Sequence, residues 1–179
     1  LIIDKTGTIT EGKPSVEKIV SYEDKDENQV LQLMASLNEM SEHPLAEAIV
    51  QYARQKEISL LKVDGFEAVS GMGIQGYING KQIALGNDKM MTLAKASVSD
   101  KESEVVHQFQ SQGKTVSYLS IDGVLMGFVV ISDAIKASSE KAIQELQKQG
   151  INVMMLTGDH ELVAKHVSQT LKLFSYKAS

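Results

Sequence analysis

The sequence predicts an α/β protein in which an open sheet is interrupted by a long insertion, and three observations support this. A short apolar run, Leu1 to Ile3, ends in an aspartate and a glycine turn, as buried strands of open sheets do. The last 45 or so residues alternate between helix and strand patterns, whereas the middle carries hairpin signals. We therefore expect residues 1–14 and 132–179 to form one domain, with residues 15–131 inserted in it.

The insertion begins with a strand pattern around Val16, Ile19 and Val20. Residues 28–40 then carry apolar side chains at helical spacing, which predicts a helix with one buried face. Pro44 follows and suits the first position of a second amphipathic helix. The insertion therefore starts with a strand and two helices.

Residues 60–87 are typical of β-structure, with Asn79-Gly80 a strong two-residue hairpin turn. Residues 97–112 predict a polar helix that ends at Gly113, and a second hairpin is expected around Asp122-Gly123. The chain then returns to α/β patterns. Helices are predicted at 138–149 and 161–171, with an apolar, parallel-type strand at 151–156 between them.

Composition excludes several classes of protein. The net charge is −5 and no two Lys or Arg residues are adjacent, which argues against nucleic acid as a partner. The longest apolar run, Val124 to Ile131, is far shorter than the ~20 residues of a membrane helix, so we expect a soluble polypeptide. Cysteine is absent, which excludes disulfides and thiolate metal sites. Because Leu1 falls inside a predicted strand without an initiator Met, we expect an excised fragment.

Residues 4–10 read Asp-Lys-Thr-Gly-Thr-Ile-Thr, and Asp4 is the candidate nucleophile. A carboxylate attacks an anionic phosphate poorly unless positive charge is near, and Lys5, the amides around Gly7 and a metal ion could supply it. Thr157-Gly158-Asp159 follows another predicted strand and precedes a helix, where a hydroxyl and a helix N-terminus could bind phosphate oxygens. The structural alternatives are a plain glycine turn and an N-cap formed by Thr157 or Asp159.

Three further motifs fall in or beside the insertion. His43, just before Pro44, could pack against an adenine ring or contact phosphate, or could merely cap the helix. Gly71 to Gly76 fits Gly-x-Gly-x-x-Gly, but a hairpin rather than a helix follows, so we reject a Rossmann fingerprint and keep close approach to a nucleotide or a bulge. Asp133 to Lys136 could be a hinge with a charge partner for the Asp4 segment, or a helix N-cap.

Taken in order, the segments DKTGTIT, SEHPLA, GMGIQG, GN, DAIK and MLTGD resemble those of copper-type heavy-metal P-type ATPases over essentially the whole chain. The resemblance implies an incomplete Rossmann-like phosphorylation domain of the haloacid-dehalogenase type, with an inserted α+β nucleotide-binding domain. It implies ATP and Mg²⁺ as cofactors, with Asp4 and the Thr6 carbonyl as magnesium ligands. The implied phosphate-site residues are Asp4, Lys5, Thr6, Thr157, Gly158 and Asp159, and the implied ATP-site residues are Glu42, His43, Gly71, Gly73, Ile74, Gly86 and Asn87.

The same resemblance implies an aspartyl-phosphate that drives copper(I) export at the cytoplasmic face of the cell membrane. Copper would not bind this fragment, and the partners would be the transmembrane and actuator domains of the full-length pump. Related phosphatases carry a second acid two residues after the nucleophile; here that residue is Thr6, so the acyl phosphate should persist. The alternatives are a free-standing phosphatase of the same superfamily, which Thr6 opposes, and a non-catalytic nucleotide-binding module.

One departure from the family's pattern limits the expected activity. The family's Gly-Asp-Gly-x-Asn-Asp segment and the lysine that precedes it are not among residues 1–179. Both would contribute charge at the reacting phosphate, so we expect ATP binding with little or no turnover. We also expect local disorder near residues 172–179, or association through an exposed sheet edge.

Overall fold

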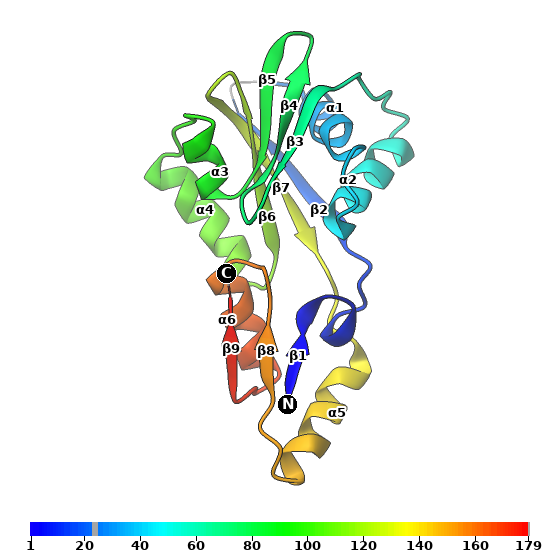
Figure 1. Cartoon of the computed structure of the whole chain (residues 1–179), viewed down its shortest axis with the longest axis vertical. Coiled ribbons are helices and arrows are strands. Elements are labelled where there is room, and N and C mark those ends of the chain that lie inside the picture. Colours follow the sequence, from blue (N-terminus) through cyan, green and yellow to red (C-terminus); the bar gives the residue numbers. More distant parts are fainter. Residues whose placement is uncertain (23–24, 179) are drawn as a thin grey trace. The chain divides into compact units, whose positions relative to one another are not determined.

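The computed structural model describes residues 1–22 and 25–178, and the chain folds as two units (Figure 1). The first unit comprises Leu1–Pro14, Val105–Thr115 and Ser132–Ser179, and the second comprises Ser15–Glu104 and Val116–Ile131. Residues 105–115 are expected in the insertion from their sequence, whereas the structure groups them with the first unit. The physical reason is that the end of helix α4 (Asp100–Ser111) and the turn after it contact helix α6 (Glu161–Thr170).

The first unit contains a three-stranded sheet in the order β1-β8-β9, and all three strands are parallel. Asp4 is in register with Leu156, so the residues that follow β1 and β8 emerge at the same edge of the sheet. The elements of this unit are β1 (Ile2–Asp4), the helical turn η1 (Lys5–Ile9), α5 (Ala137–Lys148), β8 (Met154–Leu156), α6 and β9 (Ser175–Lys177).

The core of this unit joins both helices to the sheet. Ile143 of α5 and Val167 of α6 are buried with Met155 of β8 and with Ile9. Ile9 is the last residue of η1, so its burial anchors the turn that follows Asp4. The hydrophobic core therefore fixes the end of the turn that follows Asp4.

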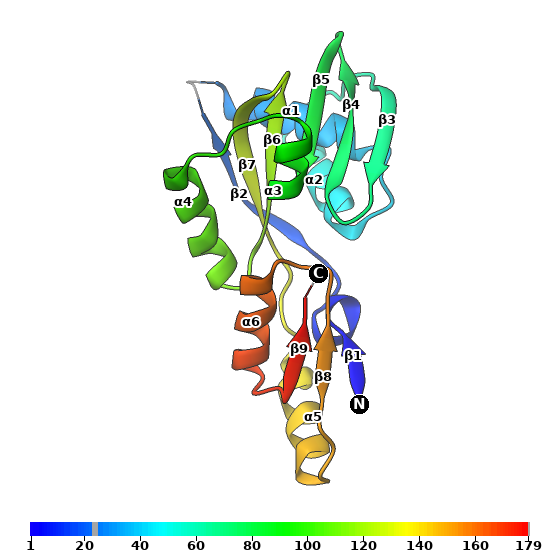
Figure 2. The same ribbon diagram turned by 60° about the vertical axis from the view of Figure 1, so that its left-hand side comes forward.

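The second unit is built on a six-stranded sheet in the order β2-β7-β6-β5-β4-β3. Figures 1 and 2 show helices α1 and α2 on one face of this sheet and α3 on the other. Its elements are β2 (Ser15–Ser21), α1 (Glu27–Asn38), α2 (Pro44–Gln55), β3 (Asp64–Val69), β4 (Gly73–Ile78), β5 (Lys81–Gly86), α3 (Asp88–Leu93), β6 (Thr115–Ile121) and β7 (Val124–Ser132).

Both hairpin turns that the sequence predicts are present. Asn79 and Gly80 have φ values of 51° and 77°, and Asp122 and Gly123 have values of 47° and 79°. Two successive positive φ angles define the type I′ turn, whose twist matches that of the flanking strands. The core packs Met34 and Leu37 of α1 and Ile49 of α2 against apolar residues of this sheet.

Two elements were not predicted. The expected disorder near residues 172–179 is contradicted for the described residues by strand β9, whereas association through the sheet edge stays a prediction. Helix α3 is only six residues long, too short for a periodic signal. Strand β9 lies where disorder was expected: it pairs with β8, and the Tyr176 hydroxyl donates a hydrogen bond to Glu161 at 2.6 Å. Ser179 lies outside the described residues.

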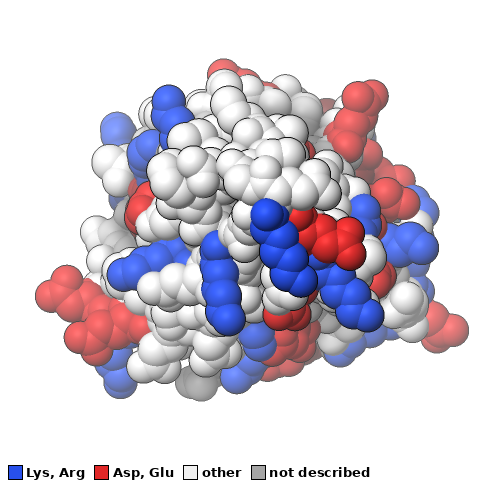
Figure 3. Space-filling model, turned by 90° about the horizontal axis from the view of Figure 1, so that it is seen from below, with Lys and Arg blue, Asp and Glu red and all other residues white. Residues whose placement is uncertain are grey.

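Charged and uncharged surface are mixed on the face shown in Figure 3, where Lys and Arg side chains stand beside Asp and Glu side chains. In the first unit, large apolar side chains at Leu1, Ile2 and Phe174 are exposed. None of the helices in the described part of the chain is long and apolar enough to cross a bilayer.

Candidate functional site

Asp4 ends β1 and presents an exposed carboxylate at the carboxyl edge of the parallel sheet. This carboxylate does not cap the η1 turn, and it makes no hydrogen bond or ion pair with any described residue. An unpaired, solvated carboxylate is available both as a nucleophile and as a metal ligand. The position that the sequence predicts for the nucleophile therefore has a side chain free to act.

The loop after Asp4 is closed by its own backbone and by Thr10. The Thr10 amide donates to the Lys5 carbonyl at 3.1 Å, and the Gly7 amide donates to Thr10 Oγ1 at 3.2 Å. Gly7 has φ 76°, a conformation in which glycine has no steric penalty. These contacts fold residues 5–10 into a tight turn directly beyond the nucleophile.

Asp133 and Lys136 hold this loop from the other side. The Thr10 hydroxyl donates to Asp133 Oδ2 at 2.6 Å, and the Gly12 amide donates to Asp133 Oδ1 at 3.1 Å. The Lys136 ammonium donates to the Gly7 carbonyl at 2.5 Å. The DAIK segment also contains the N-cap of α5, which is Lys136, although the Lys136 side chain makes no capping hydrogen bond. Both interpretations of this segment therefore apply, because it supplies the N-cap residue and also partners to the Asp4 loop.

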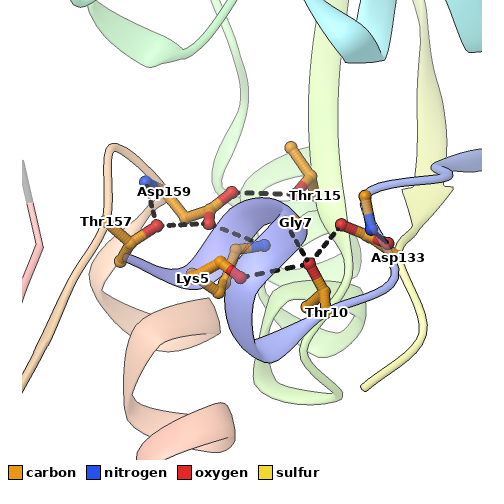
Figure 4. A network of polar contacts seen from close by, with 8 residues as sticks. Lys5, Gly7, Thr10, Thr115, Asp133, Thr157 and Asp159 are labelled. Carbon is orange, nitrogen blue, oxygen red and sulfur yellow. Dashed lines mark hydrogen bonds and ion pairs between the residues drawn. The ribbon is translucent and has the colours of Figure 1, made fainter. Parts of the chain in front are cut away.

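Asp159 is the centre of a second network, drawn in Figure 4. Lys5 Nζ lies 2.8 Å from Asp159 Oδ2, which also accepts a hydrogen bond from the Thr157 hydroxyl at 2.5 Å. Asp159 Oδ1 accepts from the Thr115 hydroxyl at 3.0 Å. The structure thus brings Lys5, Thr157 and Asp159 together, as the sequence analysis expects of residues around one phosphate.

The network shifts the acidity of Asp159. Burial by itself would raise the pKa of this carboxyl, but the charge of Lys5 and the hydrogen bonds from Lys5, Thr157 and Thr115 outweigh burial and lower the pKa. Asp159 is therefore a carboxylate held by donors on both oxygens. Its charge compensates that of Lys5, whose side chain is only 6% exposed.

The helix that follows Asp159 is capped by neither candidate of the sequence analysis. His160 is the N-cap of α6, and its Nδ1 accepts from the Leu162 amide at 3.2 Å. The N-cap alternative for Thr157 or Asp159 is therefore wrong. The single Thr157 hydroxyl proton is directed at Asp159, so this hydroxyl must turn before it can donate to a phosphate oxygen.

Thr115 is a site residue that sequence reasoning missed. It begins β6, far from both phosphate motifs in the chain, and it belongs to no sequence motif. Thr10 falls within the recognised DKTGTIT segment, but its contact with Asp133 is visible only in three dimensions. Both threonines act as hydrogen-bond donors to aspartates of other segments.

The oxygen atoms available as ligands near Asp4 suit a magnesium ion that is held largely by water and substrate. The described residues contain no group of three or more His, Cys, Asp or Glu side chains arranged to hold a metal. Asp133 and Asp159 are already engaged, which leaves the Asp4 carboxylate as the unpaired one of these three. Mg²⁺ is commonly bound through one or two carboxylates, phosphate oxygens and waters, so this limited donor set suits it.

In the second unit, His43 is the N-cap of α2 and, like Glu42, is exposed. His43 Nδ1 accepts from the Leu45 amide at 3.2 Å, so the proton of the neutral ring lies on Nε2. Nε2 has no partner among the described residues. His43 is therefore a helix cap whose outer nitrogen can still donate to a ligand.

The glycines of the second unit have different surroundings. A Cβ on Gly73 would lie 2.1 Å from the Leu85 carbonyl oxygen, and one on Gly86 would lie 2.2 Å from the Met72 carbonyl oxygen. At these two glycines the close approach is to the protein's own backbone. Gly71 has φ 70° and open space around it, and its carbonyl accepts from Asn87 Nδ2 at 2.9 Å.

Polar contacts do not connect the segment around His43 with the glycine-containing segment 71–87. No hydrogen bond or ion pair between described residues joins Glu42 or His43 to Gly71, Gly73, Ile74, Gly86 or Asn87. Asn87 connects Gly71 to the start of α3, because its Oδ1 accepts from the Met90 amide at 3.2 Å.

Comparison with known proteins defines the class. The family model of the haloacid dehalogenase-like hydrolases matches residues 1–178, and the chain belongs to this family. Among curated proteins it is 41% identical to a copper-transporting P-type ATPase of Rhizobium leguminosarum bv. viciae over 181 residues, and 37% identical to a silver exporting P-type ATPase of Salmonella typhimurium over 178 residues. The resemblance to heavy-metal P-type ATPases is thereby confirmed.

The matches cover 99% of this chain but only 21% and 22% of those two relatives, so the chain spans about a fifth of their length. Among solved structures, the catalytic domain of the CPx-ATPase CopB-B superposes with a TM-score of 0.74 at 28% identity, covering 99% of this chain and 59% of that one. A zinc-transporting PIB-type ATPase in the E2.Pi state gives 0.68 at 29% identity, covering 99% and 28%. The predicted fold class is confirmed.

Proposed function

We propose that this chain is the ATP-binding and phosphorylation region of a heavy-metal P-type ATPase, and that Asp4 accepts the γ-phosphate of ATP. The observation that carries the proposal is the contrast between three aspartates. Asp133 and Asp159 are each bound through both oxygens, whereas Asp4 is exposed and unpaired at the end of β1. Of these three aspartates, only Asp4 has a carboxylate free to attack a phosphate.

In the proposed reaction a carboxylate oxygen of Asp4 attacks the γ-phosphorus, a P–O bond to Asp4 forms, and the bond to the β-phosphate oxygen breaks to release ADP. Bound Mg²⁺ would neutralise phosphate charge, with Asp4 and the Thr6 carbonyl as its protein ligands. Residues 5–10 orient the acceptor through the contacts of Thr10, and Lys136 holds the Gly7 carbonyl. Thr6 bears a hydroxyl where an acid would be needed to activate water, so the aspartyl-phosphate persists.

ATP would bind to the second unit. His43 offers Nε2 as a donor, and Gly71 offers open space next to a turn that Asn87 holds. Glu42, Gly73, Ile74 and Gly86 complete the proposed lining. The domain roles follow: residues 1–14 and 132–179 supply the phosphorylation part, and residues within 15–131 supply the nucleotide-binding part.

Copper(I) is the proposed transported ion, and export is the proposed direction. Support comes from the names of relatives, which specify copper and silver, while a structural neighbour is named for zinc. The ion would be carried by other parts of a full-length pump, whose transmembrane and actuator domains are the proposed partners. This region would then lie at the cytoplasmic face of the membrane.

A non-catalytic nucleotide-binding module is the second candidate. It is favoured by the pairing of Lys5 with Asp159 and of the Thr157 hydroxyl with the same carboxylate, because neither group is free to meet a phosphate. The same pairing is a physical reason to expect slow phosphorylation of the isolated chain, since uncompensated repulsion between Asp4 and the γ-phosphate raises the barrier.

The test is to incubate the chain with γ-labelled ATP and Mg²⁺, quench in acid, and measure acid-stable, hydroxylamine-sensitive label. We expect slow labelling that Asp4→Asn abolishes and that Asp100→Asn, an exposed aspartate of α4, leaves unchanged. Label that survives Asp4→Asn would overturn the proposal. ATP binding in the complete absence of label would favour the non-catalytic module, and turnover of an aryl phosphate would favour a phosphatase.

A further inference from the structure

The chain from the end of α4 to the start of β6 contacts α6 and the turn before it at three points. The rings of His107 and His160 have centroids 5.9 Å apart. Gly113, with φ 80°, lies so close to the His166 ring that an added Cβ would be 2.6 Å from Cδ2. Two residues further on, the Thr115 hydroxyl donates to Asp159. We call these contacts the α4–α6 seam, and all of its residues belong to the first unit.

Thr115 has a particular place in this seam. It is the last residue of its segment of the first unit, and Val116 opens the next segment of the second unit. Asp159 Oδ2 is shared by Lys5 and Thr157, whereas Thr115 is the donor that the described residues provide to Oδ1. The Asp159 side chain is 12% exposed, so water can replace that donor only in part.

We propose that Thr115 is a positioning residue for phosphoryl transfer: its hydroxyl fixes the orientation of the Asp159 carboxylate, which in turn holds Lys5 and the Thr157 hydroxyl beside the Asp4 loop. This inference rests on the proposed function for its catalytic consequence. The inference has a structural half and a catalytic half. The structural half is that Thr115 fixes Asp159, and it depends only on the contacts of the α4–α6 seam. Thr115, the last residue before the chain enters the second unit, thereby contacts Asp159 of the proposed phosphate site.

The structural half is tested by amide hydrogen exchange measured by NMR. The Asp159 amide donates to Thr157 Oγ1 at 3.1 Å, so it reports local opening of the turn. Thr115→Val keeps the shape of the side chain and removes the donor, and should speed exchange of this amide about 5-fold, the effect of one typical hydrogen bond. Thr115→Ser should restore protection. Thr170→Val is the matched control, because Thr170 also lies in the first unit and its hydroxyl donates to the His166 carbonyl within α6.

The catalytic half is tested by labelling Asp4 from γ-labelled ATP over a range of ATP concentrations. Thr115→Val should lower the maximal rate of labelling about 5-fold or more and leave the half-saturating ATP concentration unchanged, with rescue by Thr115→Ser. Unchanged exchange of the Asp159 amide in Thr115→Val would overturn the inference, and so would faster exchange with an unchanged maximal rate. If the wild-type chain carries no label on Asp4, the proposed function fails, and the exchange experiment still decides whether Thr115 fixes Asp159.

Discussion

Lys5 Nζ lies 2.8 Å from Asp159 Oδ2, and this ion pair joins the turn after β1 to the turn after β8. The two side chains are only 6% and 12% exposed, which distinguishes this pair from the exposed pairs on the surface. A lysine that follows a phosphate-accepting aspartate invites a role in contacting phosphate. In this structure its charge is instead directed at a second carboxylate, which makes it part of the scaffold of the site.

Lys5→Met should destabilise the first unit strongly, because it leaves the buried Asp159 carboxylate without its counter-charge. Breaking a buried pair in this way costs about 3 to 5 kcal/mol in the free energy of unfolding. Urea denaturation followed through NMR signals of α6 measures it. Lys62→Met is the matched control: Lys62 pairs with Asp64, but the side chains are 84% and 68% exposed, and no measurable change is expected. Equal stabilities of the two variants would contradict the structural role of Lys5.

The stability of the first unit should fall in acid. The pKa of Asp159 is lowered in the folded state below its ordinary value of 3.8, so the unfolded state binds a proton more readily. The stabilisation is therefore fully present above about pH 5 and is lost as the pH falls through 3.8 towards the folded pKa. Urea titrations between pH 6 and pH 2 test this. In Asp159→Asn the free energy of unfolding should depend less on pH below about pH 5. A pH dependence as steep as that of the wild type would contradict the role given to Asp159.

His43 should contribute separately to stability and to nucleotide binding. His43→Asn replaces the capping imidazole with a favoured N-cap residue and removes Nε2, so we expect little change in stability but ATP binding weaker by about 5- to 150-fold. His43→Ala should lose the cap as well, at a cost of about 1 kcal/mol. Calorimetric titration with ATP measures the affinity. His107→Asn, on α4, is the control histidine, and ATP affinity equal to wild type in both His43 variants would remove His43 from the site.

The glycines of the second unit should divide into two kinds. Gly73→Ala places a Cβ 2.1 Å from the Leu85 carbonyl oxygen and should cost about 3 kcal/mol or more. Gly71→Ala meets open space and should cost only about 1 to 2 kcal/mol for its positive φ. Thermal unfolding compares the two. If nucleotide approaches Gly71, Gly71→Ala should also weaken ATP binding, whereas Gly80→Ala, at an open hairpin turn, should not.

Much of the fold follows from short stretches of sequence, because it depends on local preferences. Asn79-Gly80 and Asp122-Gly123 specify their turns through the φ angles that these residues tolerate. Helices α1, α2 and α5 follow from apolar spacing, and Pro44 begins α2 as predicted. Strand β9 could not be predicted in this way, since three residues have no periodicity and their pairing with β8 is a tertiary event.

The sequence by itself determined the class of the protein and the place of its candidate nucleophile: the motif order indicates the family, and Asp4 ends an apolar strand whatever surrounds it. Only the tertiary structure decided what the neighbouring side chains do. Lys5 pairs with Asp159, Asp133 binds Thr10, and Thr115 reaches the site from the start of β6. The physical reason is one of range: turn and helix preferences act over a few residues, whereas the partner of a buried charge is chosen by the packing of segments that are distant in the chain.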